Sequence, residues 1–131
     1  MLDTNVISSL IREPFGRVRS RIAQAGADNI CASVITAAEL HFGAVKKGSP
    51  ELRDRVKTAL SLVPVLPLPV DAASHYGLIR AELERLGRPI GANDLWIAAH
   101  ALAEAAILVT DNVREFARVG GLEFQNWIER S

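Results

Sequence analysis

Short apolar stretches alternate with longer segments of helical periodicity along the chain, and this alternation restricts the fold more than any other feature. The apolar stretches are residues 1–2, 30–32, 63–68, 107–110 and, more weakly, 122–124. They are brief and apolar throughout, as strands buried on both faces of a parallel sheet tend to be. The segments with helical spacing are residues 5–11, 17–24, 36–47, 51–62, 72–86 and 93–105. This order predicts an α/β fold with three layers, α/β/α, and a short central parallel sheet.

The composition predicts one domain inside the cell. The chain has 131 residues and no repeat or low-complexity segment, so we expect a single domain over residues 1–131. Cys31 is the only cysteine, which excludes a disulfide within the chain and favours a reducing cytoplasm. No apolar run approaches the roughly 20 residues of a membrane span, and the start lacks the features of a signal peptide. We therefore expect a cytoplasmic protein with no membrane partner.

The charge balance limits how the protein could bind nucleic acid. The 15 Lys and Arg residues equal the 15 Asp and Glu residues in number. A protein held on duplex DNA by phosphate contacts usually has a clear basic surplus, which is missing here. Any contact with nucleic acid is therefore expected to be local.

The helical segment at 93–105 is unusually apolar. Residues 95–102 are apolar on nearly all sides, and such a helix is normally covered on all sides. We expect this helix to lie between the sheet and a second cover, for which a dimer interface is one candidate.

Four acidic residues stand where a strand pattern gives way to a helix or turn. They are Asp3, Glu39, Asp94 and Asp111. In a parallel sheet these positions lie beyond the carboxyl ends of the strands, at one edge, where ligands collect. The order of the elements therefore predicts that the four carboxylates gather at that edge.

Each acid also has a purely structural explanation. Asp3 could cap the helix that follows it, and Thr36 to Glu39 matches a capping box. Asp94 lies in a first helical turn, where a negative charge favours the helix dipole by about 0.3–1 kcal/mol. Asp111 followed by Asn112 is ordinary turn chemistry. Capping, however, does not require all four acids to meet at one edge, whereas a metal site does.

A cluster of carboxylates predicts a bound cation. Unit charges about 5 Å apart repel by roughly 3 kcal/mol at an effective dielectric constant near 20, so the acids would raise one another's pKa unless a cation neutralised them. Oxygen ligands without Cys or His at metal spacing favour Mg²⁺ or Mn²⁺ over zinc. Such ions, singly or in pairs, activate water and hold a phosphodiester. The sequence therefore indicates phosphodiester hydrolysis.

At these residues the sequence resembles the PIN-domain ribonucleases and, among them, the VapC-type toxins of bacterial toxin–antitoxin pairs. The resemblance covers nearly the whole chain and rests on four ordered blocks. These are Leu2-Asp3-Thr4-Asn5, then Thr36-Ala37-Ala38-Glu39-Leu40 with Gly43, then Ile90-Gly91-Ala92-Asn93-Asp94 continuing through Leu95-Trp96-Ile97-Ala98-Ala99-His100-Ala101, and last Leu108-Val109-Thr110-Asp111-Asn112-Val113-Arg114-Glu115-Phe116. Relatives usually have a few more apolar residues before Leu2, so we expect either a short first strand at the edge of the sheet or a start codon assigned late.

The resemblance implies roles for particular residues. It makes Asp3, Glu39 and Asp94 three of the acids of the metal site. It places the fourth acid within residues 110–115, where we favour Asp111, then Glu115, then Asn112. It also implies that Asn5, Thr110 and Thr4 hold the carboxylates in position through hydrogen bonds.

The resemblance further implies an activity and its partners. We expect an endoribonuclease that cleaves transfer, ribosomal or messenger RNA. Asp3, Asp94 and Asp111 would bind Mg²⁺, or Mn²⁺ in its place, and Glu39 would position or deprotonate the attacking water. The expected partners are a second copy of the chain in a homodimer, a cognate antitoxin whose tail blocks the acidic cleft, and operator DNA contacted chiefly through that antitoxin.

Two other functions are compatible with parts of the pattern. Leu2-Asp3-Thr4-Asn5 begins like the loop of phosphatases with an aspartyl nucleophile, although Asn5 stands where those enzymes have a second Asp. A PIN-like module could also keep the fold only to bind a partner, but it would have no reason to retain repelling acids. His41, His75 and His100 do not form a catalytic arrangement in the sequence, and we expect them to be structural or on the surface.

Overall fold

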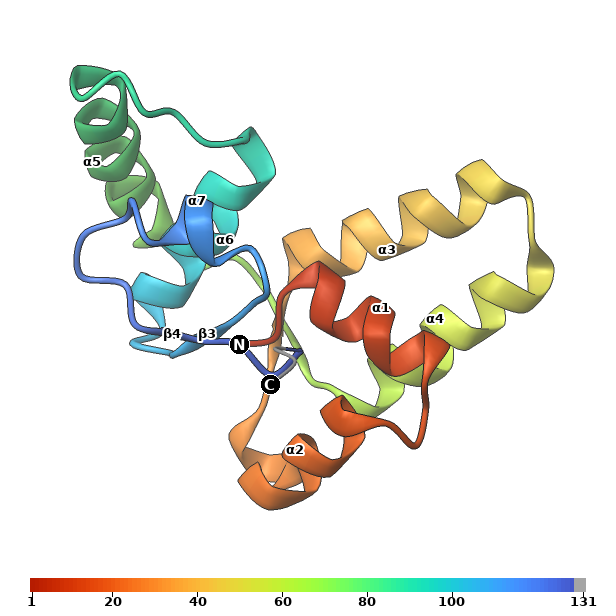
Figure 1. Cartoon of the computed structure of the whole chain (residues 1–131). Helices are drawn as coiled ribbons and strands as arrows, with labels where there is room; N and C mark the ends of the chain where they lie inside the picture. The colour runs from red at the N-terminus through yellow and green to blue at the C-terminus, as the bar shows by residue number, and fades with distance from the viewer. Residues whose placement is uncertain (129–131) are drawn as a thin grey trace.

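The computed structural model describes residues 1–128 and has seven α-helices and four short strands in that range (Figure 1). The helices are α1 (Thr4–Arg12), α2 (Arg17–Ala25), α3 (Val34–Lys47), α4 (Pro50–Leu62), α5 (Ala72–Arg85), α6 (Ala92–Ala103) and α7 (Val113–Phe116), with a 3-10 turn at Ala27–Asn29. The strands are β1 (Ala32–Ser33), β2 (Val65–Leu66), β3 (Leu108–Val109) and β4 (Phe124–Gln125). The expected domain extends to residue 131, and its last three residues lie outside the described ones.

The start of the chain joins two small parallel sheets. β1 pairs with β2 and β3 pairs with β4, both in parallel. Leu2 forms a parallel bridge to Val109, and its N–H donates to the carbonyl of Cys31 at 2.7 Å. The segments therefore lie in the order β2, β1, residues 1–3, β3, β4. The first strand is thus central, and its expected place at the edge of the sheet is wrong, because Leu2 pairs on both sides. All five predicted strand regions are confirmed.

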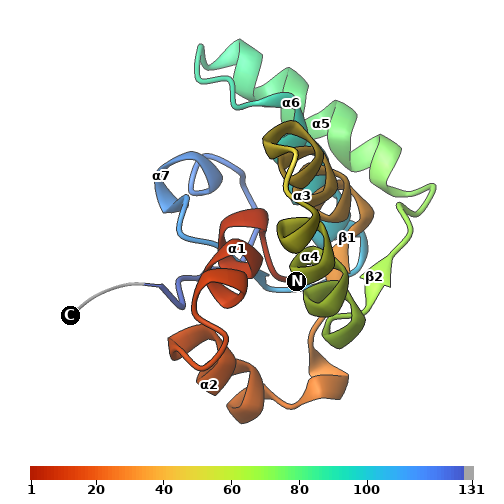
Figure 2. The ribbon, with the colours of Figure 1, turned by 90° about the vertical axis from the view of Figure 1, so that its right-hand side faces the viewer.

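The core has two halves, because side chains of the central strands alternate between the two faces of the sheet. Successive side chains of a strand point to opposite faces of the sheet. Met1 and Leu108 accordingly pack with α5, α6 and α7, whereas Leu2 and Val109 pack with α1 to α4. Figure 1 shows α5 to α7 to the left of the N-terminus and α1 to α4 to its right, and Figure 2 shows the molecule from the side of α3 and α4. The expected α/β/α layering is confirmed.

Helix α6 is covered within the chain itself. Its side chains from Ile97 to Ala101 are fully buried, as the apolar run predicted. The second cover is helix α5, which packs along α6. A dimer interface is therefore not needed to bury this helix, because residues 72–85 precede it in the chain and supply an apolar face through Ile79 and Leu83.

The predicted helices are all present, with bounds that differ by at most two residues. Two short elements were not predicted, the 3-10 turn at Ala27–Asn29 and the single turn of α7, because both are too short to show a period. Among residues 1–128, no helix is long and apolar enough to cross a membrane.

We predict that Leu2→Ala lowers the free energy of unfolding by about 2–5 kcal/mol, because it removes a side chain that is 1% exposed at the centre of the sheet. Leu78→Ala is the matched control, since Leu78 is 72% exposed on α5 and should change stability by less than about 0.5 kcal/mol. Urea denaturation of both variants measures the difference. Equal losses in the two variants would contradict the central position of the first strand.

Candidate active site

Asp3 leaves the central strand and begins helix α1. Its Oδ1 accepts from the N–H of Thr4 at 2.8 Å, and its Oδ2 accepts from the Thr110 hydroxyl at 2.7 Å. The side chain is 4% exposed, and this burial raises the pKa of Asp3 despite the two hydrogen bonds, which lower it. The charges of Glu39 and Asp111 raise it further. Asp3 thus caps a helix and also lies among the other acids.

Glu39 lies in the second turn of α3, which begins earlier than the sequence indicated. The N-cap is Ser33, whose hydroxyl accepts from the N–H of Ile35 at 3.1 Å. The capping-box interpretation of Thr36 to Glu39 is therefore wrong, because Thr36 is inside the helix and fully buried. Glu39 instead accepts from the Thr4 hydroxyl at 2.5 Å and from the Asn93 amide at 3.2 Å. Its carboxylate is therefore held by α1 and α6.

Asp94 lies in the first turn of α6, where it was expected, and has the most perturbed carboxyl group of the site. Its Oδ2 accepts from the Asn112 amide at 3.3 Å, and the same amide donates to Glu115 at 3.2 Å. Burial, then the contact with the Glu115 carboxyl and the nearby charge of Asp3, raise the pKa of Asp94 to about 7. Near neutral pH, Asp94 is thus poised between its protonated and charged forms.

Asp111 lies on the exposed side of the cluster. Its Oδ1 accepts from the Asn5 amide at 3.0 Å. Thr110, just before it, donates to Asp3 and accepts from the N–H of Asn112 at 3.0 Å. The expected hydrogen bonds from Thr4, Asn5 and Thr110 to the carboxylates are all confirmed.

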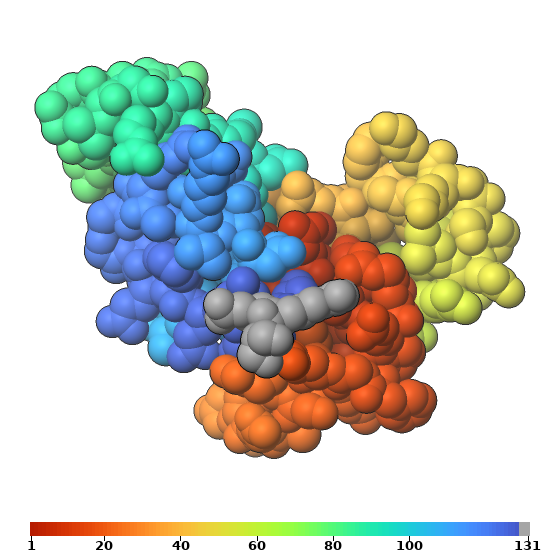
Figure 3. All heavy atoms as spheres, in the orientation of Figure 1, coloured from red at the N-terminus to blue at the C-terminus, as the bar shows by residue number. Residues whose placement is uncertain are grey.

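The predicted acids come together from four separate parts of the chain, and Glu115 joins them. Figure 3 shows the surface hollowed between the helices at left, α5 to α7, and the α3–α4 hairpin at right, above the start of α1. In residues 1–128, no three His, Cys, Asp or Glu side chains lie close enough together to hold an ion as they stand. Hydroxyl and amide donors from Thr4, Asn5 and Asn112 contact the carboxylates instead.

The donor set nevertheless fits a hard cation. Mg²⁺ and Mn²⁺ prefer carboxylate oxygens, which all five acids of the cluster offer. These acids are Asp3, Glu39, Asp94, Asp111 and Glu115. Burial is the main cause that raises the pKa of Asp3 and of Asp94, and neighbouring negative charges raise both further. A bound cation would offset both effects, because it favours the charged carboxylates.

Two asparagines form hydrogen bonds in the site that were not predicted. Asn93 precedes Asp94 on α6 and donates to Glu39, and Asn112 bridges Asp94 and Glu115. Each asparagine adjoins an acid of the site in the sequence, which is the signal that could have identified it.

His100 is structural, as expected. It is fully buried on α6, and its Nδ1 lies 2.8 Å from the hydroxyl of Ser33 at the start of α3. Burial lowers the pKa of His100 and favours the neutral ring. The contact with Ser33 ties α6 to α3.

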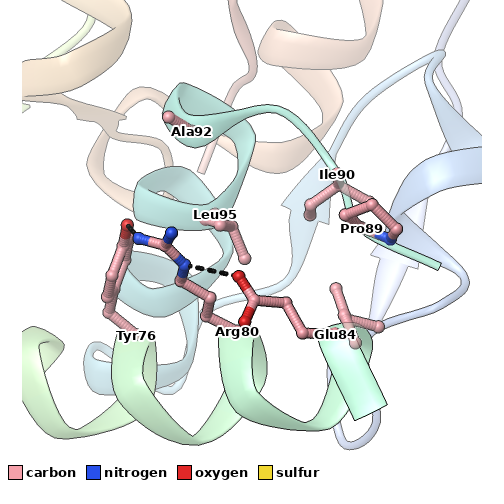
Figure 4. Close-up of a pocket in the computed structure, with 8 residues that line it drawn as sticks. Tyr76, Arg80, Glu84, Pro89, Ile90, Ala92 and Leu95 are labelled. Carbon is pink, nitrogen blue, oxygen red and sulfur yellow. Dashed lines mark hydrogen bonds and ion pairs between the residues drawn. The ribbon is translucent and has the colours of Figure 1, made fainter. Parts of the chain in front are cut away.

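A second hollow lies beside the start of α6, on the α5 side. Its volume is about 210 Å³, and Figure 4 shows Arg80 between Tyr76 and Glu84 in its wall. Arg80 donates to Glu84 at 3.0 Å and to the Tyr76 hydroxyl at 3.1 Å. The guanidinium is therefore engaged on its own helix, as expected of a solvated helix charge.

Comparison with known proteins identifies the class of this chain. The family model of the PIN domain matches residues 1–122. Ribonuclease VapC2 of Haemophilus influenzae is 43% identical over 129 residues, which cover 98% of this chain and 97% of that protein. The tRNA(fMet)-specific endonuclease VapC of Shigella flexneri is 43% identical over 128 residues, which cover 97% and 96%.

A solved structure agrees with these relatives. The chain superposes with a TM-score of 0.91 on a chain of DNA-bound VapBC from Salmonella typhimurium, at 39% identity, covering 97% of this chain and 96% of that one. The chain therefore belongs to the PIN-domain family and, within it, to the VapC type.

We predict that the metal-free protein loses stability as the pH rises from about 4 to about 7. The pKa of Asp94 is higher in the folded state than in the unfolded chain. Between about pH 4 and pH 7 the unfolded chain therefore loses this proton more readily, which stabilises it relative to the folded state. Because Asp94 is half-exposed, the loss is on the order of 1–2 kcal/mol. Asp94→Asn should be more stable than the wild type by that amount near pH 8 and equal to it near pH 4.

Urea denaturation in EDTA at both pH values measures this difference. Asp28→Asn is the matched control, because Asp28 is exposed and far from the cluster in the sequence. If the gain from Asp94→Asn were the same at both pH values, the raised pKa would be refuted.

Proposed function

We propose that this chain is a divalent-metal-dependent endoribonuclease toxin, a single-domain protein with a cognate antitoxin. The supporting observation is that Asp3, Glu39, Asp94 and Asp111 lie near one another, with the pKa of buried Asp3 and of half-exposed Asp94 raised. A structural protein would have no use for acids whose ionisation is disfavoured in this way. Membership of the VapC type supports the same function.

The metal ligands of this proposal are Asp3, Asp94 and Asp111. Mg²⁺, or Mn²⁺ in its place, supplies a water of lowered pKa and charge stabilisation for the leaving oxygen of a phosphodiester. Thr110 fixes Asp3, and Asn5 fixes Asp111, through their hydrogen bonds. Asn112 holds Asp94 and Glu115 together. These contacts orient the carboxylate oxygens before substrate arrives.

Glu39 positions or deprotonates the attacking water. Its side chain is half-buried at the cluster, and the Thr4 hydroxyl and Asn93 amide hold one oxygen each. A general base must be placed within hydrogen-bond reach of the proton that it accepts. Donors from α1 and α6 restrict the rotation of Glu39 and keep it facing the other acids.

RNA is the proposed substrate, and transfer RNA is the first to test, because the Shigella flexneri relative is named for tRNA(fMet). The proposed protein partner is the antitoxin, through which the toxin would meet operator DNA. The similar chain from Salmonella typhimurium was solved as DNA-bound VapBC, which supports both. A groove of about 430 Å³ between α1, α2 and α4 combines apolar side chains, such as Leu10 and Leu62, with charged ones, such as Arg19 and Arg55, and suits a protein segment.

We also propose that the chain forms a homodimer. Large apolar side chains remain exposed on the described surface, including Phe42 at 66% and Val45 at 59% on α3. Exposed apolar patches commonly mark protein interfaces. The cytoplasm is the proposed location, where RNA and antitoxin are both present.

The test incubates purified, antitoxin-free protein with transfer RNA and with total RNA, in Mg²⁺ and in EDTA. We expect cleavage in Mg²⁺ only, and Asp94→Asn should reduce its rate by about 100-fold or more, since removing even a supporting residue of a metal site costs about 10–100-fold. Asp28→Asn should cut like the wild type. Undiminished cleavage by Asp94→Asn or in EDTA would refute the metal site, and absence of any cleavage would favour a silent binding module.

A second comparison decides which residue is the fourth acid. If Asp111 binds the ion, Asp111→Asn should raise the Mg²⁺ concentration for half-maximal cleavage by about 10-fold or more, and Glu115→Gln should raise it less. Glu115 is the serious rival, because its carboxyl group contacts Asp94. A larger effect from Glu115→Gln would transfer the role to Glu115.

A further inference from the structure

A groove leads away from the acidic cluster between α1, α3 and α4. Its volume is about 260 Å³, and its lining includes Thr4 and Glu39, which belong to the cluster. The lining also includes Arg12 and Lys47, the last residues of α1 and α3. Figure 1 shows these three helices side by side, running away from the N-terminus. The groove therefore connects the acids to two positive charges.

The α3 wall of the groove follows a simple pattern in the sequence. Glu39, Gly43 and Lys47 are four residues apart and share one face of the helix, and all three line the groove. At 1.5 Å per residue, Lys47 lies about 12 Å along the axis from Glu39. The two charged residues thus contact different parts of any extended chain that occupies the groove.

Gly43 leaves the middle of this wall without a side chain. A Cβ atom built at Gly43 meets no heavy atom of the chain within 4 Å, and the helix there has no positive φ that would require glycine. Gly in a helix interior costs about 1 kcal/mol relative to Ala. Neither packing nor backbone conformation accounts for that cost, whereas room in the groove does.

Arg12 and Lys47 are exposed and are available to bind a ligand. In the part of the chain that the structure describes, neither side chain forms a hydrogen bond or an ion pair. A structural explanation exists, because cations in a last helical turn favour the helix dipole. Lys46 occupies the same last turn as Lys47 but lies over the Phe42 ring, outside the groove. The helix dipole therefore explains Lys46 and Lys47 equally well, but only Lys47 lines the groove.

We propose that this groove binds the sugar-phosphate backbone of single-stranded RNA beside the scissile phosphate, with flanking phosphates on Arg12 and Lys47. This inference rests on the proposed ribonuclease function and names the substrate path of the same site. An RNA strand held at the acids meets a negative surface, so a continuous groove with cations beyond it supplies the missing attraction. Arg and Lys are the usual partners of RNA phosphates, and such contacts do not depend on base sequence.

Binding is tested in full-length protein with Asp94→Asn as background, so that RNA is not cut. The probe is a fluorescein-labelled single-stranded RNA, followed by anisotropy over a salt titration. Arg12→Ala and Lys47→Ala should each weaken binding by about 5- to 10-fold and reduce the slope of log K against log salt by about 0.7. Lys46→Ala, the matched control, should leave affinity and slope unchanged.

The space at Gly43 is tested separately, in the protein with intact acids. Gly43→Leu should keep the melting temperature at or above that of the wild type, yet lower kcat/KM for RNA cleavage by about 10-fold or more, mainly through KM. Gly77→Leu is the matched control, because Gly77 is also inside a helix, α5, with nothing within 4 Å of a built Cβ. It should gain stability and retain activity.

The outcomes separate this inference from the proposed function. A wild type that does not cleave RNA overturns the function itself. A wild type that cleaves, with Lys47→Ala equal to Lys46→Ala and Gly43→Leu equal to Gly77→Leu, overturns the groove alone. If Lys47→Ala binds RNA normally but loses affinity for the antitoxin, the groove is assigned to a protein segment and the inference is likewise overturned. Arg12→Ala takes no part in this comparison, because Arg12 also lines the groove between α1, α2 and α4.

Discussion

The gathering of acidic side chains at one edge of the sheet, with Asp3 buried and Asp94 half-exposed, is the constraint on which the rest of the structure depends. Burial is the largest cause of the raised pKa of both Asp3 and Asp94. The charges of Glu39 and Asp111 add to it at Asp3, and the charge of Asp3 adds to it at Asp94. The fold offsets these effects with donors from separate elements, chiefly Thr4, Thr110 and Asn112. A cation would replace these donors with a stronger attraction. The acids can therefore coexist without an ion but are prepared for one.

The short parallel sheet determines where these acids meet. Its central segment has only three residues, yet Leu2 pairs on both sides, with β1 through Cys31 and with β3 through Val109. Asp3 follows directly, and Asp111 follows β3 two residues after Val109. The carboxyl ends of neighbouring parallel strands lie at one edge, so this pairing alone brings residues more than 100 positions apart into one site.

Helix α3 links the proposed chemistry to the proposed substrate path. Ser33 fixes its first turn, and the contact between Ser33 and His100 ties that turn to α6, which bears Asp94. Along one face of α3 the charge changes from Glu39, through the bare backbone at Gly43, to Lys47. A single rigid helix can therefore set the distance between the acidic site and a cation that would hold the adjoining strand of substrate.

The sequence by itself determined the elements and predicted which acids lie near one another. Alternating apolar and helical segments are local patterns, and they predicted all five strand regions, six helices and the gathering of Asp3, Glu39, Asp94 and Asp111. Local pattern failed at Thr36, where a capping box was expected but Ser33 caps the helix. Only the tertiary structure decided that α5 covers α6, that Glu115 contacts Asp94, and that Arg12 and Lys47 line one groove. The physical reason is that these contacts join segments whose distance in space depends on the packing of whole helices, which no local period encodes.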